Sequence, residues 1–372
     1  MKKCDKLILQ TSEMPVDCIK TLSKGKEKIM KNSIIQQKEV PVFFAADENY
    51  LPFLGVTLTS LIKHADVNRK YAIHVLYTGA LGDNANKIMD LAKGNISLQF
   101  HDVTPQICEI QHMIHCRDYY TSAIYFRLFI PQLFPKYDKA VYLDCDTVLL
   151  TDIAKLYDIP LGGNYIGAVA DPIVSATPAF AAYTKYALGI EARKYFNSGV
   201  IVMQLEKLRN INFCHLFMRV LRSYDFVVAP DQDCLNLICK DKVHYFGKEW
   251  NAMPLSNVKF GAPKLIHYNL SMKPWHYDGV LYERYFWDTA KDTPFYQTIC
   301  NKKRAFSKEQ AKQDEESGAR LLRLAQAEAE NPYNYERTVG ARLRMYQKSK
   351  EVGGMYGFIE YFGGQKSAVN TD

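Results

Sequence analysis

The sequence predicts an α/β fold in which a mixed, mostly parallel sheet carries helices on both faces. The prediction depends on an alternation along the chain, in which apolar runs of strand length are followed by stretches of helical periodicity. A strand over residues 40–46 (VPVFFAA) precedes a helix over residues 50–64, and a strand at 71–79 precedes a helix that Gly94 closes. Elements that alternate at this spacing form βαβ units, whose sheets are covered on both faces.

The pattern continues through the middle of the chain. A strand is expected over residues 96–103, followed by an aromatic helix over 122–134 (SAIYFRLFIPQLF) and a strand over 139–146 (KAVYLDCD). A further helix is expected around residues 209–224. These segments extend the predicted sheet beyond its first three strands.

The C-terminal part has a different composition. Ser307 and Gln310 have the spacing of a capping box, so they predict the start of a charged helix that Asn331 and Pro332 end. The following stretch, residues 341–364, is basic, aromatic and interrupted by glycines. We therefore expect a helical C-terminal appendage.

The chain divides into three parts by composition. Residues 1–39 are Lys-rich and aperiodic, which predicts a poorly ordered basic leader. Residues 40–300 form the predicted catalytic domain, and residues 301–372 form the charged and aromatic helical extension. The 372 residues are 48% hydrophobic, which is enough for one large core or two smaller ones.

The charge is concentrated at the two ends. The formal charge is +7, but residues 41–300 hold 25 basic and 25 acidic side chains. A neutral body argues against nucleic-acid binding, which needs a basic face. The basic ends leave peripheral contact with an anionic membrane open.

The cysteines and the N-terminus predict a cytoplasmic protein. Nine cysteines are scattered without a C-x-x-C pair, which is typical of reduced, mostly buried thiols. The apolar run Leu7–Leu9 is too short for a signal peptide, and no window has the length of a membrane span.

The first chemical motif is Asp144-Cys145-Asp146. In an extended segment, residues i and i+2 point the same way, so both carboxylates can face one divalent cation at the end of a buried strand. The motif interrupts an otherwise apolar run, where two carboxylates carry a desolvation cost unless a cation or partner offsets it. The alternative is a pair of strand-end carboxylates that cap backbone amides.

His267 and Lys273 form the second motif. His267 ends the apolar run KLI, and Lys273 follows six residues later, a spacing that lets a loop hold imidazole and ammonium near one anion. Two carboxylates and an imidazole suit Mn²⁺ better than Mg²⁺, which remains the alternative cofactor.

Six blocks in order give the chain a resemblance to glycosyltransferase family 8. They are FFAADENY at 43–50, YFRLFIPQLFP at 125–135, KAVYLDCDTVLL at 139–150, YFNSGVIVMQL at 195–205, PDQDCLN at 230–236 and HYNLSMKPWH at 267–276. The family includes bacterial lipopolysaccharide galactosyl- and glucosyltransferases and glycogenin. The resemblance implies a GT-A fold and transfer of a hexose, glucose or galactose, from a UDP-sugar to a saccharide or lipid-linked saccharide acceptor, with retention of configuration.

The resemblance also implies roles for individual residues. Matching positions make Asp144, Asp146 and His267 the metal ligands, with Cys145 in the same donor-binding block. Further donor-binding positions are Ala45, Asp47, Asn49 and Tyr50 beside the uridine, Arg127 on the aromatic helix, and Lys273 on the diphosphate. Asp171, Asn197, Asp231 and Gln232 match positions around the transferred sugar. Three structural alternatives stay open: Arg127 could pair with a buried acid, Asn197 could fix a β-bulge, and Tyr50 could be a core aromatic.

The route to retention depends on the candidate catalytic residues Gln232, Asp231 and Asp171. An amide is a poor nucleophile, so Gln232 does not favour double displacement. We prefer a front-face route, in which the departing phosphate guides the acceptor hydroxyl; Asp171 or Asp231 would be the nucleophile in the alternative, double displacement. Since the chain lacks a Gly-rich phosphate loop, a cation must balance the diphosphate charge.

Two other functions are alternatives to glycosyl transfer. A sugar nucleotidyltransferase needs a Gly-rich loop after the first strand, where this chain reads AADENY. A catalytically silent UDP-sugar-binding scaffold is the third interpretation.

The C-terminal tail has two possible roles, docking at the inner face of the membrane or packing on the protein. Both involve the same basic and aromatic residues: Arg342, Arg344, Lys348, Lys350, Tyr346, Tyr356, Phe358, Tyr361 and Phe362. One departure stands out: Leu270 occupies a position where bacterial relatives often have glycine.

Overall fold

A seven-stranded mixed sheet forms the centre of the protein. The computed structural model describes residues 39–114 and 121–364, so most of the predicted leader lies outside the described residues. The strand order is β3-β2-β1-β4-β7-β6-β8. The bounds are β1 (Val40–Ala45), β2 (Tyr71–Tyr77), β3 (Ile96–Asp102), β4 (Ala140–Leu143), β6 (Ile166–Ala170), β7 (Phe196–Met203) and β8 (Val243–Tyr245).

Most strand pairs are parallel, which confirms the predicted fold class. Strands β3, β2, β1 and β4 run parallel to one another, and β8 runs parallel to β6. Strand β7 is antiparallel to β4 and to β6. A separate antiparallel pair joins β5 (Thr147–Leu149) to β9 (Leu265–His267).

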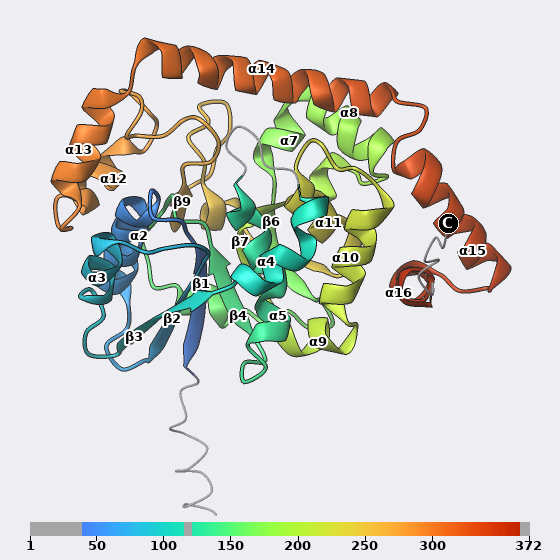
Figure 1. Cartoon of the computed structure of the whole chain (residues 1–372), viewed down its shortest axis with the longest axis horizontal. Helices are drawn as coiled ribbons and strands as arrows, with labels where there is room; N and C mark the ends of the chain where they lie inside the picture. Colours follow the sequence, from blue (N-terminus) through green and yellow to red (C-terminus); the bar gives the residue numbers. More distant parts are fainter. Residues whose placement is uncertain (1–38, 115–120, 365–372) are drawn as a thin grey trace, which may run out of the picture. The chain divides into compact units, whose positions relative to one another are not determined.

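Helices cover both faces of the sheet (Figure 1). Successive strand residues point to opposite faces, so Phe43 packs in one apolar cluster while Val42 and Phe44 pack in the other. One face carries α2 (Leu51–His64), α3 (Asp83–Met89), α6 (Ala154–Tyr157), α12 (Glu283–Ala290) and α13 (Tyr296–Ala305). The other carries α4 (Thr104–Ile110), the 3₁₀ helix η2 (Ser122–Phe129), α5 (Ile130–Leu133), α7 (Pro172–Ala176), α8 (Pro178–Ala187), α9 (Leu205–Asn210), α10 (Phe213–Ser223) and α11 (Pro230–Ile238).

Four predicted boundaries were wrong. The helix expected to close at Gly94 ends at Met89, and Gly94 instead supplies a φ of 63° in the turn before β3. The aromatic helix is a 3₁₀ helix followed by a four-residue α-helix with Pro131 in its first turn. The segment 209–224 divides into α9 and α10, where Asn212 adopts a φ of 52°. Strand β4 ends at Leu143, so Asp144–Asp146 is a turn rather than extended strand.

A β-bulge interrupts β7 next to the site. Ile201 pairs with Ala168 and Phe196 pairs with Ala170, so four residues of β7 lie opposite one residue of β6. Extra residues in one strand leave the regular ladder and re-aim their side chains. The bulge therefore lies at the start of β7 and includes Asn197, as the structural alternative for Asn197 anticipated.

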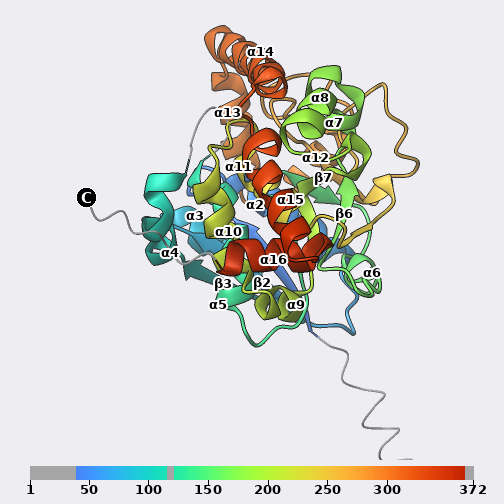
Figure 2. The same ribbon diagram turned by 90° about the vertical axis from the view of Figure 1, so that its right-hand side faces the viewer.

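The C-terminal extension packs on the catalytic body as a series of helices. Helix α14 (Lys308–Glu330) starts with the predicted capping box, since Ser307 and Gln310 exchange both hydrogen bonds. It runs across the top of Figure 1 and packs against α8. Helices α15 (Ala341–Ser349) and α16 (Gly354–Gly364) follow, and Figure 2 shows α16 in front of the sheet, beside α10.

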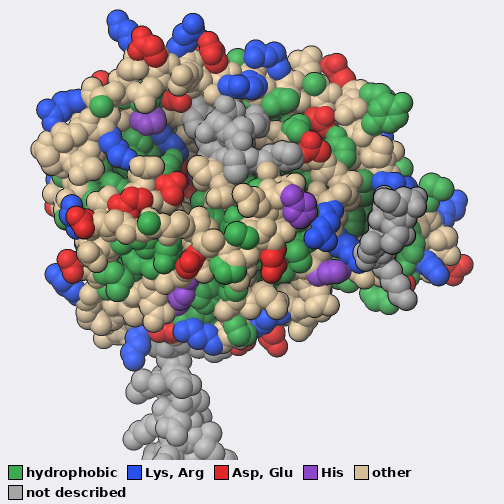
Figure 3. All heavy atoms as spheres, viewed as in Figure 1, with side chains coloured by type: hydrophobic (Ala, Val, Ile, Leu, Met, Phe, Trp, Pro, Cys, Tyr) green, Lys and Arg blue, Asp and Glu red, His purple; other side chains and the backbone are tan. Residues whose placement is uncertain are grey.

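Basic and acidic side chains are interspersed over the face drawn in Figure 3. Among the described residues, none of the helices combines the length and the apolar character needed to span a bilayer.

A buried histidine predicts that acid weakens the fold. His74 of β2 is 2% exposed, lies 2.9 Å from His101 Nε2 and 2.8 Å from the Tyr137 hydroxyl, and stacks on Phe43. Burial, with the charges of His101 and Lys136, lowers the pKa of His74 from 6.5 to about 3. The unfolded chain therefore binds a proton below pH 6.5 that the folded chain does not.

The expected result is a free energy of unfolding that His74 leaves unchanged above pH 6.5. It should fall as the pH drops from 6.5 toward 3, by at most about 1.4 kcal/mol per pH unit from this residue. Urea unfolding at pH 7 and pH 5 tests this, and His74→Gln should reduce the difference between the two pH values. An equal acid loss in both proteins would remove His74 as the cause.

Candidate functional site

Three side chains that the sequence singled out meet at one point. Strand β5 pairs with β9 in a register that sets Thr147 opposite His267, and this brings the turn Asp144–Asp146 beside the imidazole. His267 Nε2 lies 3.2 Å from Asp146 Oδ1 and 3.6 Å from Asp144 Oδ2. One ligand atom from each residue falls within 4.8 Å of the others, a spacing that one divalent cation can bridge.

A chain of side-chain amides sets the tautomer of His267. The Gly199 N–H donates to Asn197 Oδ1 (3.0 Å), and the Asn251 amide also donates to that oxygen (2.9 Å). Asn251 Oδ1 must then face His267 Nδ1, at 3.0 Å, so Nδ1 carries the proton. The remaining nitrogen, Nε2, presents its lone pair to the two carboxylates, as in a metal-ligating histidine.

The donor set fits a cation. Asp146 Oδ1 and His267 Nε2 are buried, and neither has a hydrogen-bond partner among the described residues. Two lone-pair atoms facing each other in a buried site are unfavourable unless a positive charge lies between them. Asp144 Oδ1 accepts hydrogen bonds from Arg127 and Tyr142, which leaves Oδ2 for the same cation.

Lys273 lies at the edge of this cluster. Its ammonium is 5% exposed, pairs with Asp146 Oδ2 and donates to the Tyr268 carbonyl at 2.5 Å. Burial opposes the charge on Asp146, but the adjacent Lys273 ammonium holds the pKa of that carboxyl below its usual range. The pair keeps both charges in place at neutral pH.

Gly199 is a site residue that sequence reasoning missed. A Cβ at this position would lie 2.4 Å from His267 Cε1 and 2.5 Å from Asp144 Oδ2. A glycine inside a strand often marks such a close approach, so the signal was present in YFNSGVIVMQL. Asn251 was also missed, and no motif around it points to the site.

Arg127 pairs with the buried Asp231, as its structural alternative anticipated, and with the partly exposed Asp144. Its guanidinium is 3% exposed, donates to Asp144 Oδ1 (2.9 Å) and lies 3.6 Å from Asp231 Oδ2. It also donates to the Ser198 carbonyl at 2.6 Å and covers the Tyr142 ring at 4.3 Å. Arg127 therefore orients a predicted metal ligand while it lines the cleft.

Two adjoining cavities meet at Asp144. We call them the nucleotide-side and sugar-side cavities, after the roles that the sequence resemblance leads us to expect of the residues that line them. Predicted donor-binding residues line the nucleotide-side cavity: Ala45, Asp47, Tyr50, Arg127, Asp144, Cys145, Asp146 and Lys273. Asn49 does not line it, because its side chain is exposed and its carbonyl accepts a hydrogen bond from Lys302. Tyr50 packs edge-on against Phe53 at 5.5 Å, and burial raises its pKa to about 12.

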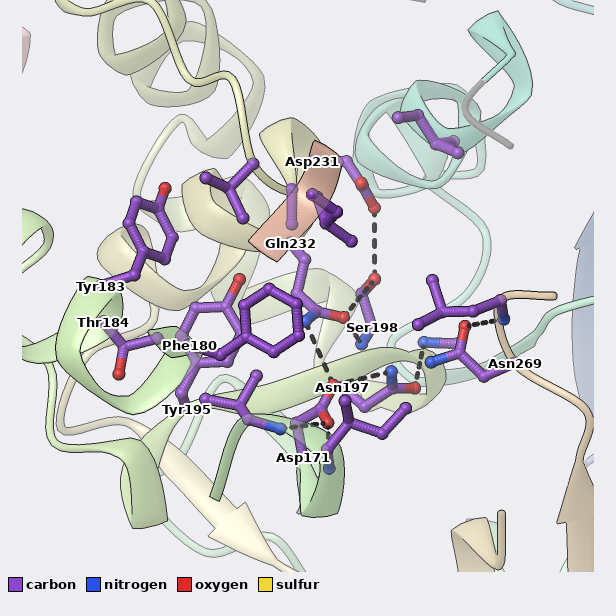
Figure 4. Close-up of a pocket in the computed structure, with 18 of the residues that line it drawn as sticks. Asp171, Phe180, Tyr183, Thr184, Tyr195, Asn197, Ser198, Asp231, Gln232 and Asn269 are labelled. Carbon is purple, nitrogen blue, oxygen red and sulfur yellow. Dashed lines mark hydrogen bonds between the residues drawn. The ribbon is translucent and has the colours of Figure 1, made fainter. Parts of the chain in front are cut away.

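The sugar-side cavity has a hydrogen-bonded floor (Figure 4). Gln232 Oε1 accepts from the Ser198 N–H (2.9 Å), while its Nε2 donates to Asp171 Oδ2 (3.3 Å). Asn197 donates to the same Asp171 oxygen at 3.1 Å. The other oxygen, Oδ1, caps α7 by accepting from the N–H groups of residues 173 and 174. The amide of Gln232 is thus fixed in one orientation.

Two buried carboxyls adjoin this floor: Asp231 lines the same cavity, and Asp233 is held by two tyrosines that line it. Burial raises the pKa of Asp231 to about 6, although Arg127 opposes the shift. Burial also raises the pKa of Asp233 to about 7, and Tyr195 and Tyr183 donate hydrogen bonds to it at 2.6 and 2.7 Å. Asp233 belongs to the block PDQDCLN but was not predicted as a site residue.

Leu270 keeps the backbone of a glycine. Its φ of 56° lies in the left-handed region, which costs a leucine about 1–2 kcal/mol. It lines both cavities at their junction. The leucine side chain therefore lies between the two cavities.

Fold and site together define an α/β protein whose acidic and histidine cluster lies where two cavities join. The chain is similar to several known proteins. The lipopolysaccharide 1,2-glucosyltransferase of Escherichia coli is 28% identical over 253 residues, which cover 63% of this chain and 72% of that protein. General stress protein A of Bacillus subtilis is 27% identical over 253 residues, covering 62% and 85%. A solved structure of the galactosyltransferase LgtC with donor and acceptor sugar analogs matches with a TM-score of 0.60 at 25% identity, over 68% of this chain and 96% of LgtC.

The family model for glycosyl transferase family 8 matches residues 41–279. The chain belongs to this family, and it is a retaining hexosyltransferase with a GT-A-like fold.

Proposed function

We propose that this chain transfers glucose or galactose from a UDP-sugar to a saccharide acceptor, such as a lipopolysaccharide or another cell-surface glycan. The observation that carries the proposal is the buried, unpartnered pair of Asp146 Oδ1 and His267 Nε2 beside Asp144. Support for the donor and acceptor classes comes from the relatives, one named as a lipopolysaccharide glucosyltransferase and one solved with sugar analogs. We propose that the transfer takes place in the cytoplasm, as the scattered cysteines of the sequence predict.

Asp144, Asp146 and His267 would hold Mn²⁺, with Mg²⁺ as the alternative. A bound divalent cation supplies electrostatic stabilisation of the charge that develops on a leaving diphosphate. Lys273 adds a second positive charge at the same end of the nucleotide-side cavity. Arg127 holds Asp144 so that one of its oxygens stays directed at His267.

The same residues favour a front-face route to retention. Gln232 is uncharged, and its carbonyl oxygen already accepts a hydrogen bond from Ser198. Asp231 is buried against Arg127, while Asp171 accepts hydrogen bonds on both oxygens. None of the three is a free carboxylate nucleophile. A covalent glycosyl-enzyme trapped on Asp171 or Asp231 would overturn this route.

UDP release from UDP-glucose and UDP-galactose tests the function. With Mn²⁺ we expect slow hydrolysis even without an acceptor, and EDTA should abolish it. Asp146→Ala removes a ligand and the partner of Lys273, so turnover should fall about 100-fold or more. Asp138→Ala is the matched control, because that side chain is 65% exposed and distant from the cluster.

The outcomes separate the interpretations. Metal-dependent release that favours one sugar and disappears in Asp146→Ala supports the proposal and identifies the donor. Binding of UDP without turnover of either sugar would favour a silent UDP-sugar-binding scaffold. Synthesis of a UDP-sugar from UTP and a sugar phosphate would favour a nucleotidyltransferase.

Peripheral contact with the inner face of the membrane remains part of the proposal. Phe358 and Phe362 are buried against the core, whereas Tyr356 and Met345 are 70% and 72% exposed beside basic residues of α15. Flotation with anionic liposomes should recover the full chain, and Tyr356→Ser with Met345→Ser should reduce the recovery. Equal recovery of both proteins would leave packing as the role of the tail.

A further inference from the structure

The sugar-side cavity has two chemically different walls. Its floor is the polar set of Asp171, Asn197, Ser198 and Gln232 described above. The rest of its lining includes an apolar set, which we call the apolar wall: Ile173, Val174, Phe180, Val228 and Leu321. Figure 4 shows Phe180 on the α8 side of the cavity, away from Asn269 at its other end.

The hydroxyl groups near the apolar wall already donate hydrogen bonds to acceptors within the protein. The hydroxyls of Tyr183 and Tyr195 donate to Asp233, and the Thr184 hydroxyl donates to the carbonyl of residue 181 at 3.2 Å. A ligand hydroxyl pressed against this wall would exchange water for carbon atoms, which is unfavourable. A methyl group would gain from the same burial.

Helix α14 holds Leu321 in place. The Tyr277 hydroxyl donates to Asp314 near the start of the helix at 2.8 Å, and the Tyr224 hydroxyl donates to Glu328 near its end. Between these anchors the helix packs along α8, and Leu321 is 9% exposed. The wall is therefore a fixed surface rather than the tip of a loop.

The position of the wall assigns it to the acceptor. Phe180 and Leu321 line the sugar-side cavity and not the cavity that holds Tyr50 and Asp47. A UDP-sugar with its uridine in the nucleotide-side cavity passes Asp144 before its sugar reaches the polar floor. The acceptor, which lies beyond the donor sugar in this order, is then the group that contacts the apolar wall.

We propose that the acceptor sugar carries a methyl group, in an acetamido or a 6-deoxy substituent, which packs against Leu321 and Phe180. Leu321 is thus a specificity-determining residue for the acceptor. The inference rests on the proposed function, whose donor it leaves unchanged.

A panel of simple sugars tests the inference. UDP release with Mn²⁺ is measured with the UDP-hexose that the chain hydrolyses, in the presence of the free sugars glucose, galactose, N-acetylglucosamine, N-acetylgalactosamine, fucose and rhamnose. We expect kcat/KM to be about tenfold or more higher for one methyl-bearing class than for glucose and galactose. The N-acetyl and 6-deoxy arms distinguish the two sources of the methyl group.

Variants of Leu321 connect the preference to the wall. Leu321→Gln should lower the ratio of kcat/KM for the preferred methyl-bearing acceptor to kcat/KM for glucose and galactose about fivefold or more. The reason is that the amide offers hydrogen bonds to an acceptor hydroxyl. Leu321→Ala should enlarge the space and improve use of N-propionyl over N-acetyl sugars. Leu322→Gln is the matched control, since that neighbour is 39% exposed and outside the cavity, and its ratio should equal that of the wild type.

Several results would overturn the inference. Equal or better use of glucose and galactose acceptors is one, and an unchanged ratio in Leu321→Gln and Leu321→Ala proteins that keep their melting temperature is another. A preference for methyl-bearing sugars among UDP donors instead of acceptors would refute the acceptor assignment. If the chain releases UDP from no UDP-sugar, the proposed function fails as well, which separates that failure from a loss of acceptor preference alone.

Discussion

Replacing Arg127 by methionine should lower the free energy of unfolding by about 3–5 kcal/mol, the usual cost of removing one partner of a buried ion pair. The guanidinium is 3% exposed and serves Asp144, Asp231 and the Ser198 carbonyl at once. Methionine keeps most of the volume but leaves the Asp231 carboxyl buried beside no cation. Urea unfolding at pH 7 measures the change.

Arg193→Met is the control for this experiment. Arg193 also pairs with an acid, Glu191, but both side chains are largely exposed. Exposed pairs of this kind contribute little, so the control should unfold like the wild type. A loss below about 1 kcal/mol in Arg127→Met would show that water or another group takes over the role of the guanidinium.

Gly199→Ala should weaken Mn²⁺ binding at the proposed metal site and lower the activity with it. The added Cβ would fall 2.4 Å from His267 Cε1 and 2.5 Å from Asp144 Oδ2, so at least one predicted ligand must move. Metal affinity and UDP release should each fall about 100-fold, since displaced ligands and their supports affect both. Overpacking should also cost about 1–3 kcal/mol of stability. Calorimetric titration with Mn²⁺ and the UDP assay give the two readouts.

Gly163→Ala separates this effect from a general cost of adding a methyl group. A Cβ at Gly163 would meet no atom within 4 Å, and the residue lies outside both cavities. That variant should bind Mn²⁺ and release UDP like the wild type. Full metal affinity in Gly199→Ala would mean that Asp144 or His267 is not a ligand.

The sheet could be predicted from the sequence because its strands are short apolar runs with clear breaks. Where the structure departs from expectation, tertiary contacts override local signals. The run around Phe213 is continuously helical in pattern, yet Asn212 adopts a left-handed backbone and divides it. Pro131 similarly limits the aromatic segment to short turns. Neither break changes the order of the strands.

The candidate site was predictable only where a motif carried it. Asp144, Asp146 and His267 meet because of the β5–β9 register, which the two motifs implied but did not specify. The amide chain through Asn197 and Asn251 depends on a bulge and on a loop far along the sequence, so spacing alone could not reveal it. Asn49 shows the converse, since it belongs to a matching block but its side chain lies outside the cavity.

Helix α14 has a consequence for how such enzymes diversify. The shared family region ends at residue 279, whereas Leu321 lies 42 residues later and still reaches the sugar-side cavity. The residues that we propose bind the nucleotide and the residue that we propose completes the acceptor wall are thus separate along the chain. Under that proposal, a change confined to α14 would alter the acceptor preference and leave the cluster of Asp144, Asp146 and His267 as it is.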